Sequence, residues 1–318
     1  VDLQKNDGYN VSLPAGRYDD RFQLIINYKS PPFVWVGDDS NLWSEPQNWE
    51  FKGSEPLSPP SDSNDVLVPF THNPYPTVNG NYAVRNLTLR AGAELTVGCG
   101  ALLTSNGNVT LDTNAVFTVE DNDENNSGEV RIFGNINSNN GIFNFERWSR
   151  KWQYHFYSSP IIGADNKLVS NTNPKHNYWW NESRRTWARN NDNPLLNTRG
   201  YEAYYNIDVF AVFSGTSFVN NDPHSIPVHM TGSEDIWKRG INLIGNPYPF
   251  TIEIDAFLDD NNSHIENSIW IWDEKDYSLT PYTSDNLVTY NPIIGYVSSN
   301  VSDRTFAGNI LPTQGFMV

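Results

Sequence analysis

Apolar and polar side chains alternate with a period of two between residues 84 and 145. The apolar positions are odd-numbered in two long runs, from Leu87 to Leu103 and from Val109 to Val119. Successive side chains of a β-strand point to opposite faces, so this alternation predicts strands with one buried face. Glycines interrupt the runs at short intervals and predict tight turns between the strands. These glycines are Gly92, Gly98, Gly100 and Gly107.

The spacing of these strands favours a stacked architecture. Strand centres recur roughly every 8–14 residues, which is typical of a short-strand β-solenoid or β-roll. A β-sandwich is the competing interpretation. After the acidic loop 121–128 the apolar positions become even-numbered, at Val130 and Ile132. We therefore expect this loop to be inserted between successive turns of the stack.

The whole chain is predicted to be all-β, in three parts. Residues 1–30 are expected to supply closing strands, either of a preceding β module or of the sheet formed by residues 240–318. Residues 31–145 form a tryptophan-rich opening and the solenoid-like domain. Residues 146–318 form an aromatic-rich, sandwich-like β domain. The final residues, from Gly315 onward, are typical of an unfinished strand, so we expect this domain to continue beyond residue 318.

Composition narrows the class of partners. The net charge is −16 with a pI near 4.6, which disfavours nucleic acid and anionic membranes. Aromatic residues make up 14% of the chain, including 11 tryptophans, so there is ample apolar surface to bury. No apolar run reaches about 18 residues, so no membrane span is expected. The one cysteine, Cys99, excludes an internal disulfide and is expected to be a small buried thiol.

A second feature is an abrupt strand end after Leu243 and Ile244. The next five residues are Gly-Asn-Pro-Tyr-Pro, from Gly245 to Pro249. Two prolines and a glycine in this space end a strand and stiffen the connection that follows. We expect a rigid corner against which Tyr248 packs as a buried aromatic side chain.

Several segments, in this order, resemble modules of large secreted cell-surface proteins of Bacteroidetes, which are adhesin-like and exported by type IX secretion. The resemblance rests on Trp35-Val36-Gly37, Trp43, Asn48-Trp49, Asp65 to Pro69, Gly240 to Phe250, Ile269 to Asp273 and Leu311 to Phe316. It implies a secreted, extracellular or outer-membrane-surface location and a sorting domain elsewhere in the parent protein. It brings no catalytic residues, and it implies a structural or adhesin-like role.

An enzymatic role finds no support among the sequence motifs. The chain has no G-x-S-x-G elbow, no P-loop and no dinucleotide-binding fingerprint. Its adjacent carboxylates, such as Asp259 and Asp260, would be solvated in a loop or would point to opposite faces of a strand. We therefore expect a non-catalytic module. The alternative is a carbohydrate-binding accessory region of a polysaccharide-degrading enzyme.

The candidate carbohydrate site is a cluster of tryptophans with polar neighbours. Exposed aromatic faces can stack on sugar rings, and amide and carboxylate groups can bond the hydroxyls. Tryptophans that fill a thin β core are the alternative. Because the chain is acidic, neutral glycans are the expected small ligands, and other surface proteins are the other candidate partners. The residues are Trp179, Trp180, Trp187, Asn177, Asn181 and Glu182.

The acidic loop is the candidate calcium site. Hard oxygen ligands at alternating positions suit Ca²⁺. The loop departs from the EF-hand pattern because Asn126 stands where that pattern has glycine, and a solvated acidic turn is the alternative. The candidate ligands are Asp121, Asp123, Asn125 and Glu129.

Overall fold

The computed structural model confirms the all-β prediction. Among the residues that it describes it contains one α-helix, and the other regular elements are strands and two short 3-10 turns. The described residues are 3–4, 10–11, 30–71, 74–122, 126–151, 154–165, 177–190, 194–219, 221–231, 240–272, 287–297 and 308–318.

The chain divides into two compact units, residues 1–30 and 31–318. In the first unit, β1 (Leu3–Gln4) pairs with β2 (Asn10–Val11) as an antiparallel ladder. The strand expected between residues 21 and 28 lies outside the described residues.

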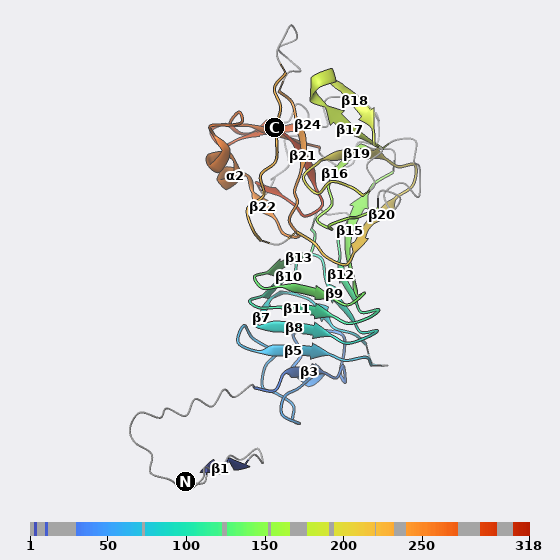
Figure 1. Cartoon of the computed structure of the whole chain (residues 1–318), viewed down its shortest axis with the longest axis vertical. Helices are drawn as coiled ribbons and strands as arrows, with labels where there is room; N and C mark the ends of the chain where they lie inside the picture. Colours follow the sequence, from blue (N-terminus) through green and yellow to red (C-terminus); the bar gives the residue numbers. More distant parts are fainter. Residues whose placement is uncertain are drawn as a thin grey trace, which may run out of the picture. The chain divides into compact units, whose positions relative to one another are not determined.

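The second unit begins with a three-sided β-solenoid, whose stacked turns are visible in Figure 1. One side stacks β14 (Ile136–Ser138), β11 (Val109–Leu111), β8 (Asn86–Leu89), β5 (Asp65–Val68), β3 (Phe33–Trp35) and β4 (Trp49–Glu50). A second side stacks β20 (Val209–Gly215), β15 (Ile142–Ser149), β12 (Val116–Val119), β9 (Glu94–Val97) and β6 (Thr77–Val78). The third stacks β13 (Glu129–Ile132), β10 (Leu102–Ser105) and β7 (Asn81–Val84).

Parallel register places like side chains above one another inside the coil. Leu87 lies between Val66 and Val109, so one turn is 22 residues long at this point. Val109 pairs with Ile136, a step of 27 residues, because the loop between β12 and β13 is longer than the one between β9 and β10. The odd difference between these steps moves the buried positions to even numbers in β13. The inserted loop that the sequence predicted is thus confirmed.

The odd-numbered apolar positions form the core of the solenoid, as predicted. Twelve of them are at most 2% exposed: Leu87, Leu89, Ala93, Leu95, Val97, Ala101, Leu103, Val109, Leu111, Ala115, Phe117 and Val119. Ala91 is exposed and Cys99 is half-buried, so the expectation of a buried thiol was wrong. Both residues lie in turns, where the period of two no longer applies.

Three tryptophans close the first turn of the solenoid. Trp35, Trp43 and Trp49 are each at most 1% exposed, and their rings meet edge to face at 4.6–5.0 Å. The side chain of Asn48, in η1 (Pro46–Asn48), is fully buried beside them. Its Oδ1 accepts from the backbone N–H groups of residues 39 and 40, and its Nδ2 donates to the oxygens of residues 40 and 42. The Asn-Trp pair therefore supplies both a tie for the covering loop and an apolar lid.

Two antiparallel sheets follow the solenoid and enclose an aromatic cluster. One contains β16 (Tyr154–Tyr157), β19 (Tyr201–Tyr204), β17 (Asn177–Asn181) and β18 (Thr186–Arg189). The other contains β21 (Leu243–Gly245), β27 (Gly315–Met317), β23 (Ile269–Trp272), β24 (Leu287–Asn291) and β25 (Gly295–Val297). A short ladder, β22 (Ile252–Glu253) with β26 (Asn309–Ile310), leads into α2 (Ile254–Asn261). Phe156, Leu243 and Met317 are buried between the two larger sheets, which gives the expected sandwich-like packing.

The Gly-Asn-Pro-Tyr-Pro corner is organised by a buried amide. Asn246 is fully buried, and its Nδ2 lies 2.9–3.2 Å from the carbonyl oxygens of Phe250, Ile310 and Leu311. Its Oδ1 accepts from the backbone N–H of Tyr248 at 2.9 Å. The amide thereby bonds its own corner to the chain that leads into β27.

The backbone around the corner is equally constrained. The backbone N–H of Asn246 donates to Gln314, and its carbonyl accepts from the Ser158 hydroxyl at 2.9 Å. A Cβ on Gly245 would lie 2.3 Å from Cβ of Ser158, so only glycine permits this approach. Tyr248 is half-buried, stacked on Phe250, and not the buried side chain expected from the sequence.

We predict that Asn246→Ala lowers the free energy of unfolding by about 4 kcal/mol, because three carbonyls and one N–H lose their buried partner. Chemical denaturation measures this loss. Asn79→Ala, the same change at an exposed asparagine, is the control and should cost less than about 0.5 kcal/mol. Equal losses in the two variants would contradict the role assigned to the Asn246 amide.

Candidate functional site

A short hairpin presents most of the residues predicted for carbohydrate binding. Strands β17 and β18 are joined by the 3-10 turn η2 (Glu182–Arg184). Asn181 caps this turn, because its Oδ1 accepts from the backbone N–H of Arg184 at 3.1 Å. Arg185 closes it in the left-handed conformation, with φ of 50°. The hairpin therefore fixes the positions of the tryptophans on either side of the turn.

Consecutive tryptophans on β17 point to opposite faces, as strand geometry requires. Trp179 packs on the core that continues from the solenoid. Trp180 packs in the aromatic cluster between the sheets, where Trp187 meets it edge to face at 5.4 Å. The three rings thus do not form one flat platform, and Trp187 serves mainly to pack against Trp180.

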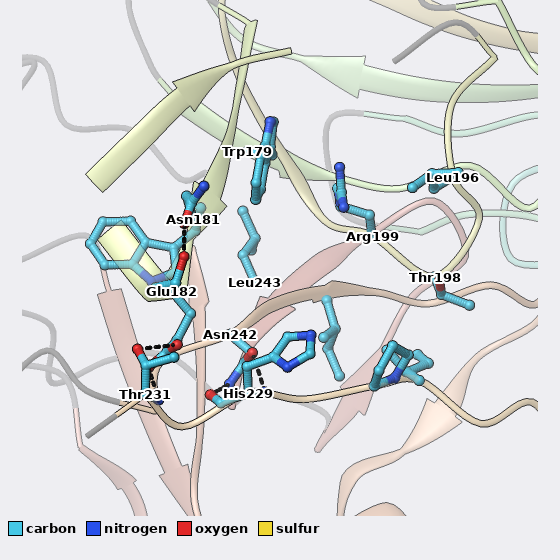
Figure 2. A pocket seen from close by; sticks show the side chains of 15 residues that line it. Trp179, Asn181, Glu182, Leu196, Thr198, Arg199, His229, Thr231, Asn242 and Leu243 are labelled. Carbon is cyan, nitrogen blue, oxygen red and sulfur yellow. Dashed lines mark hydrogen bonds between the residues drawn. The ribbon is translucent and has the colours of Figure 1, made fainter. Parts of the chain in front are cut away.

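Four of the six predicted residues line one cleft of about 440 Å³, shown in Figure 2. They are Trp179, Trp180, Asn181 and Glu182. Neither Trp187 nor Asn177 is among its lining residues. Asn177 is buried, and its Oδ1 accepts from the Tyr157 hydroxyl at 2.6 Å. The remaining lining residues are Ser183, Leu196, Thr198, Arg199, Ile226, Pro227, His229, Thr231, Asn242, Leu243 and Ile244.

Trp179 and Arg199 form the polar-aromatic side of the cleft. The Arg199 guanidinium carbon lies 4.3 Å from the centre of the Trp179 ring, a cation–π contact. In Figure 2 the two side chains stand next to each other, with Leu196 beyond them. The stacking holds the guanidinium at the cleft wall, where its N–H donors are within the same space as the indole.

Glu182 anchors the opposite wall and is buried. Its carboxylate accepts from the backbone N–H and hydroxyl of Thr231, at 2.9 and 2.7 Å, and from the N–H of Gly240 at 3.0 Å. Burial raises the pKa of Glu182, but these hydrogen bonds and the charge of Arg185 outweigh burial, so the pKa is lowered overall. Glu182 is therefore ionised and engaged with protein, which makes it a structural residue of the cleft.

Asn242 holds the same wall by a two-way amide contact. Its Oδ1 accepts from the backbone N–H of His229 at 2.9 Å, and its Nδ2 donates to the His229 carbonyl at 3.0 Å. The side chain thus replaces a partner strand for the segment that contains Ile226 and Pro227. Sequence reasoning missed this wall, Thr198 and Arg199, because these residues are far from the tryptophans along the chain and no local motif marks them.

The calcium hypothesis stays a prediction. Asp123 and Asn125 lie outside the described residues. The Asp121 carboxylate is buried; it accepts from the Ser127 hydroxyl at 2.6 Å and lies 3.8 Å from the Arg147 guanidinium. Glu129 accepts from the hydroxyl and N–H of Thr251, at 2.5 and 3.2 Å. Both described candidates therefore already have protein partners.

Cys99 has the character of an unreactive thiol. Burial, and then the charges of Glu120 and Asp121, raise its pKa to about 11. The thiolate is the nucleophilic form, so at neutral pH this side chain is protonated and weakly reactive.

A buried carboxyl group, Glu202, was not anticipated from the sequence. It is 8% exposed on β19, and its cross-strand neighbours are Phe156 and Tyr178. No described residue donates a hydrogen bond to its carboxyl group. Burial raises the pKa of Glu202 to about 8, so it is mainly protonated at neutral pH.

The fold defines the class of protein: a tryptophan-capped parallel β-solenoid followed by an antiparallel β-sandwich. Residues 34–318 match the family described as Domain of unknown function (DUF8693), and the chain belongs to this family. Comparisons with curated proteins and with solved structures give no match. No helix in the described part of the chain is long and apolar enough to cross a membrane.

We predict that Glu202 makes stability depend on pH. Its pKa rises from 4.5 when unfolded to about 8 when folded, so the folded state binds more protons between these values. Stability should therefore fall as the pH rises from about 4.5 to about 8. Glu202→Gln should remove this slope and raise stability at pH 9 by ~3 kcal/mol. Denaturation midpoints across the pH range test this, with exposed Glu50→Gln as control. Parallel pH curves for the wild type and Glu202→Gln would contradict it.

Proposed function

We propose that this chain is a non-catalytic structural or adhesin-like module of a secreted bacterial cell-surface protein. The observation that carries the proposal is the continuity of the hydrogen-bonded stack. The solenoid sheet passes from β6 through β12 to β15, and β15 pairs with β20 along its length. A closed stack of this kind suits a rigid spacer that displays a folded domain.

The buried polar groups support a structural role. Asn48 ties the cap, Asn246 ties the corner, and Glu182 ties the wall of the cleft. Among the described residues there is no group of three or more His, Cys, Asp or Glu side chains that could hold a metal ion. The resemblance to Bacteroidetes surface modules adds the expectation of type IX export and an extracellular or outer-membrane-surface location.

Surface location and adhesion can be tested in the bacterium that encodes the chain. We expect protease added to intact cells to digest the protein, because it is displayed outside the outer membrane. Deleting residues 31–318 from the encoded protein should lower attachment of cells to surfaces or to other cells, while growth in suspension is unchanged. Digestion only after lysis would contradict surface display, and unchanged attachment would contradict the adhesin-like role.

The cleft favours a second function, carbohydrate binding. Its volume of about 440 Å³ is within the usual range of small-ligand sites. Apolar side chains such as Leu243 and Ile244 lie beside the Trp179 ring and the polar groups of Asn181 and Thr198. This mixture suits a sugar, which has apolar ring faces and hydroxyls at its edge.

Carbohydrate binding can be tested with a glycan array and titration of the strongest hits. We expect weak binding, near 10⁻⁴ M, because the site offers few buried hydrogen bonds. Trp179→Leu keeps an apolar contact but removes the aromatic face, and should weaken binding about tenfold or more. Phe133→Leu, at an exposed aromatic residue of the solenoid, should leave it unchanged. A blank array would eliminate this second function and leave the structural role.

A further inference from the structure

The hairpin beside the cleft has a local charge opposite to that of the whole chain. Between residues 177 and 199 there are four arginines and two carboxylates, whereas the full chain has 37 acidic and 21 basic residues. The arginines are Arg184, Arg185, Arg189 and Arg199. The potential at a cleft depends on nearby charges, because charges beyond about 10 Å are largely screened at moderate salt.

The positions of these arginines relate the charge to the cleft itself. Arg199 lines it, with its guanidinium over Trp179. Arg184 is exposed at the end of η2, next to the lining residue Ser183. A sugar ring placed against the indole would therefore have one guanidinium at its edge and another at the cleft rim. Arginine presents planar N–H donors that match a carboxylate.

The one carboxylate among the lining residues does not offset this arrangement. The oxygens of Glu182 accept three hydrogen bonds from Thr231 and Gly240, and its charge is balanced by Arg185. The other polar lining groups include the neutral side chains of Asn181, Thr198 and Asn242. Such groups bond hydroxyls without discriminating between charged and neutral sugars.

We propose that the cleft takes a carboxylated saccharide, with a uronate-type ring against Trp179 and its carboxylate toward Arg199 and Arg184. This inference rests on the proposed carbohydrate-binding function and names its ligand class. It replaces the neutral glycans expected from the overall charge, because the net charge of −16 is distributed over the whole chain whereas the ligand meets the arginines.

The test compares two probes that differ only in charge: trigalacturonate and its fully methyl-esterified form. Titration of the whole chain, followed by calorimetry or tryptophan fluorescence at 20 mM salt, should show about tenfold tighter binding of the acid. The advantage should shrink at 300 mM salt, because exposed charge pairs are screened.

Two variants and a control locate the preference. Arg199→Gln should remove most of it, and Arg184→Gln, at an exposed position that carries little folding risk, should reduce it about threefold. Arg90→Gln, a matched loss of charge on the solenoid, should leave the preference unchanged.

Each outcome decides between the two proposals. A preference for the acid that falls in the cleft variants supports a carboxylated ligand. Equal binding of acid and ester, or a preference that persists in both cleft variants, overturns this inference and leaves carbohydrate binding in place. If neither probe binds and the glycan array is blank, both proposals fail.

Discussion

The second half of this protein depends on one buried amide. Asn246 bonds the backbone at Tyr248, Phe250, Ile310 and Leu311, which belong to segments about 60 residues apart. Buried backbone groups must find partners, and where two strands diverge at a corner no ladder can supply them. The asparagine side chain has both donors and an acceptor, so a single residue can satisfy the turn and the chain beside it. The cleft depends on the same constraint, because β21 ends at this corner and contributes two of its lining residues.

The corner also explains how the solenoid ends. A parallel coil leaves unpaired strand edges at each end, and such edges pair readily with other chains. At the start, tryptophans and the Asn48 loop cover the first turn. At the other end, the backbone N–H of Val130 donates to the carbonyl of Pro249, and Glu129 bonds Thr251. The two prolines hold this backbone extended, so the sandwich covers the third side of the coil without a separate capping element.

Much of this fold could be predicted from the sequence because its signals are local. A period of two survives wherever a strand is paired on both sides, and it fails at turn residues such as Cys99. The aromatic hairpin was found from its composition alone. Its arrangement could not be predicted, since neighbouring positions on β17 point to different cores. Arg199 and Asn242 were missed because the cleft forms only when strands from distant segments meet, and a lone arginine or asparagine carries no local signal.

The treatment of charge at the cleft follows from the same competition between structure and binding. A carboxylate can serve as a ligand contact only if its oxygens remain available, and the wall formed by residues 226–231 has no strand partner of its own. Glu182 and Asn242 supply that partner through side chains, at the cost of removing an anion from the surface available to ligands. What remains exposed near Trp179 is cationic, in a protein whose net charge is strongly negative. Local structural demands, rather than overall composition, therefore set the sign of the charge that a ligand would meet.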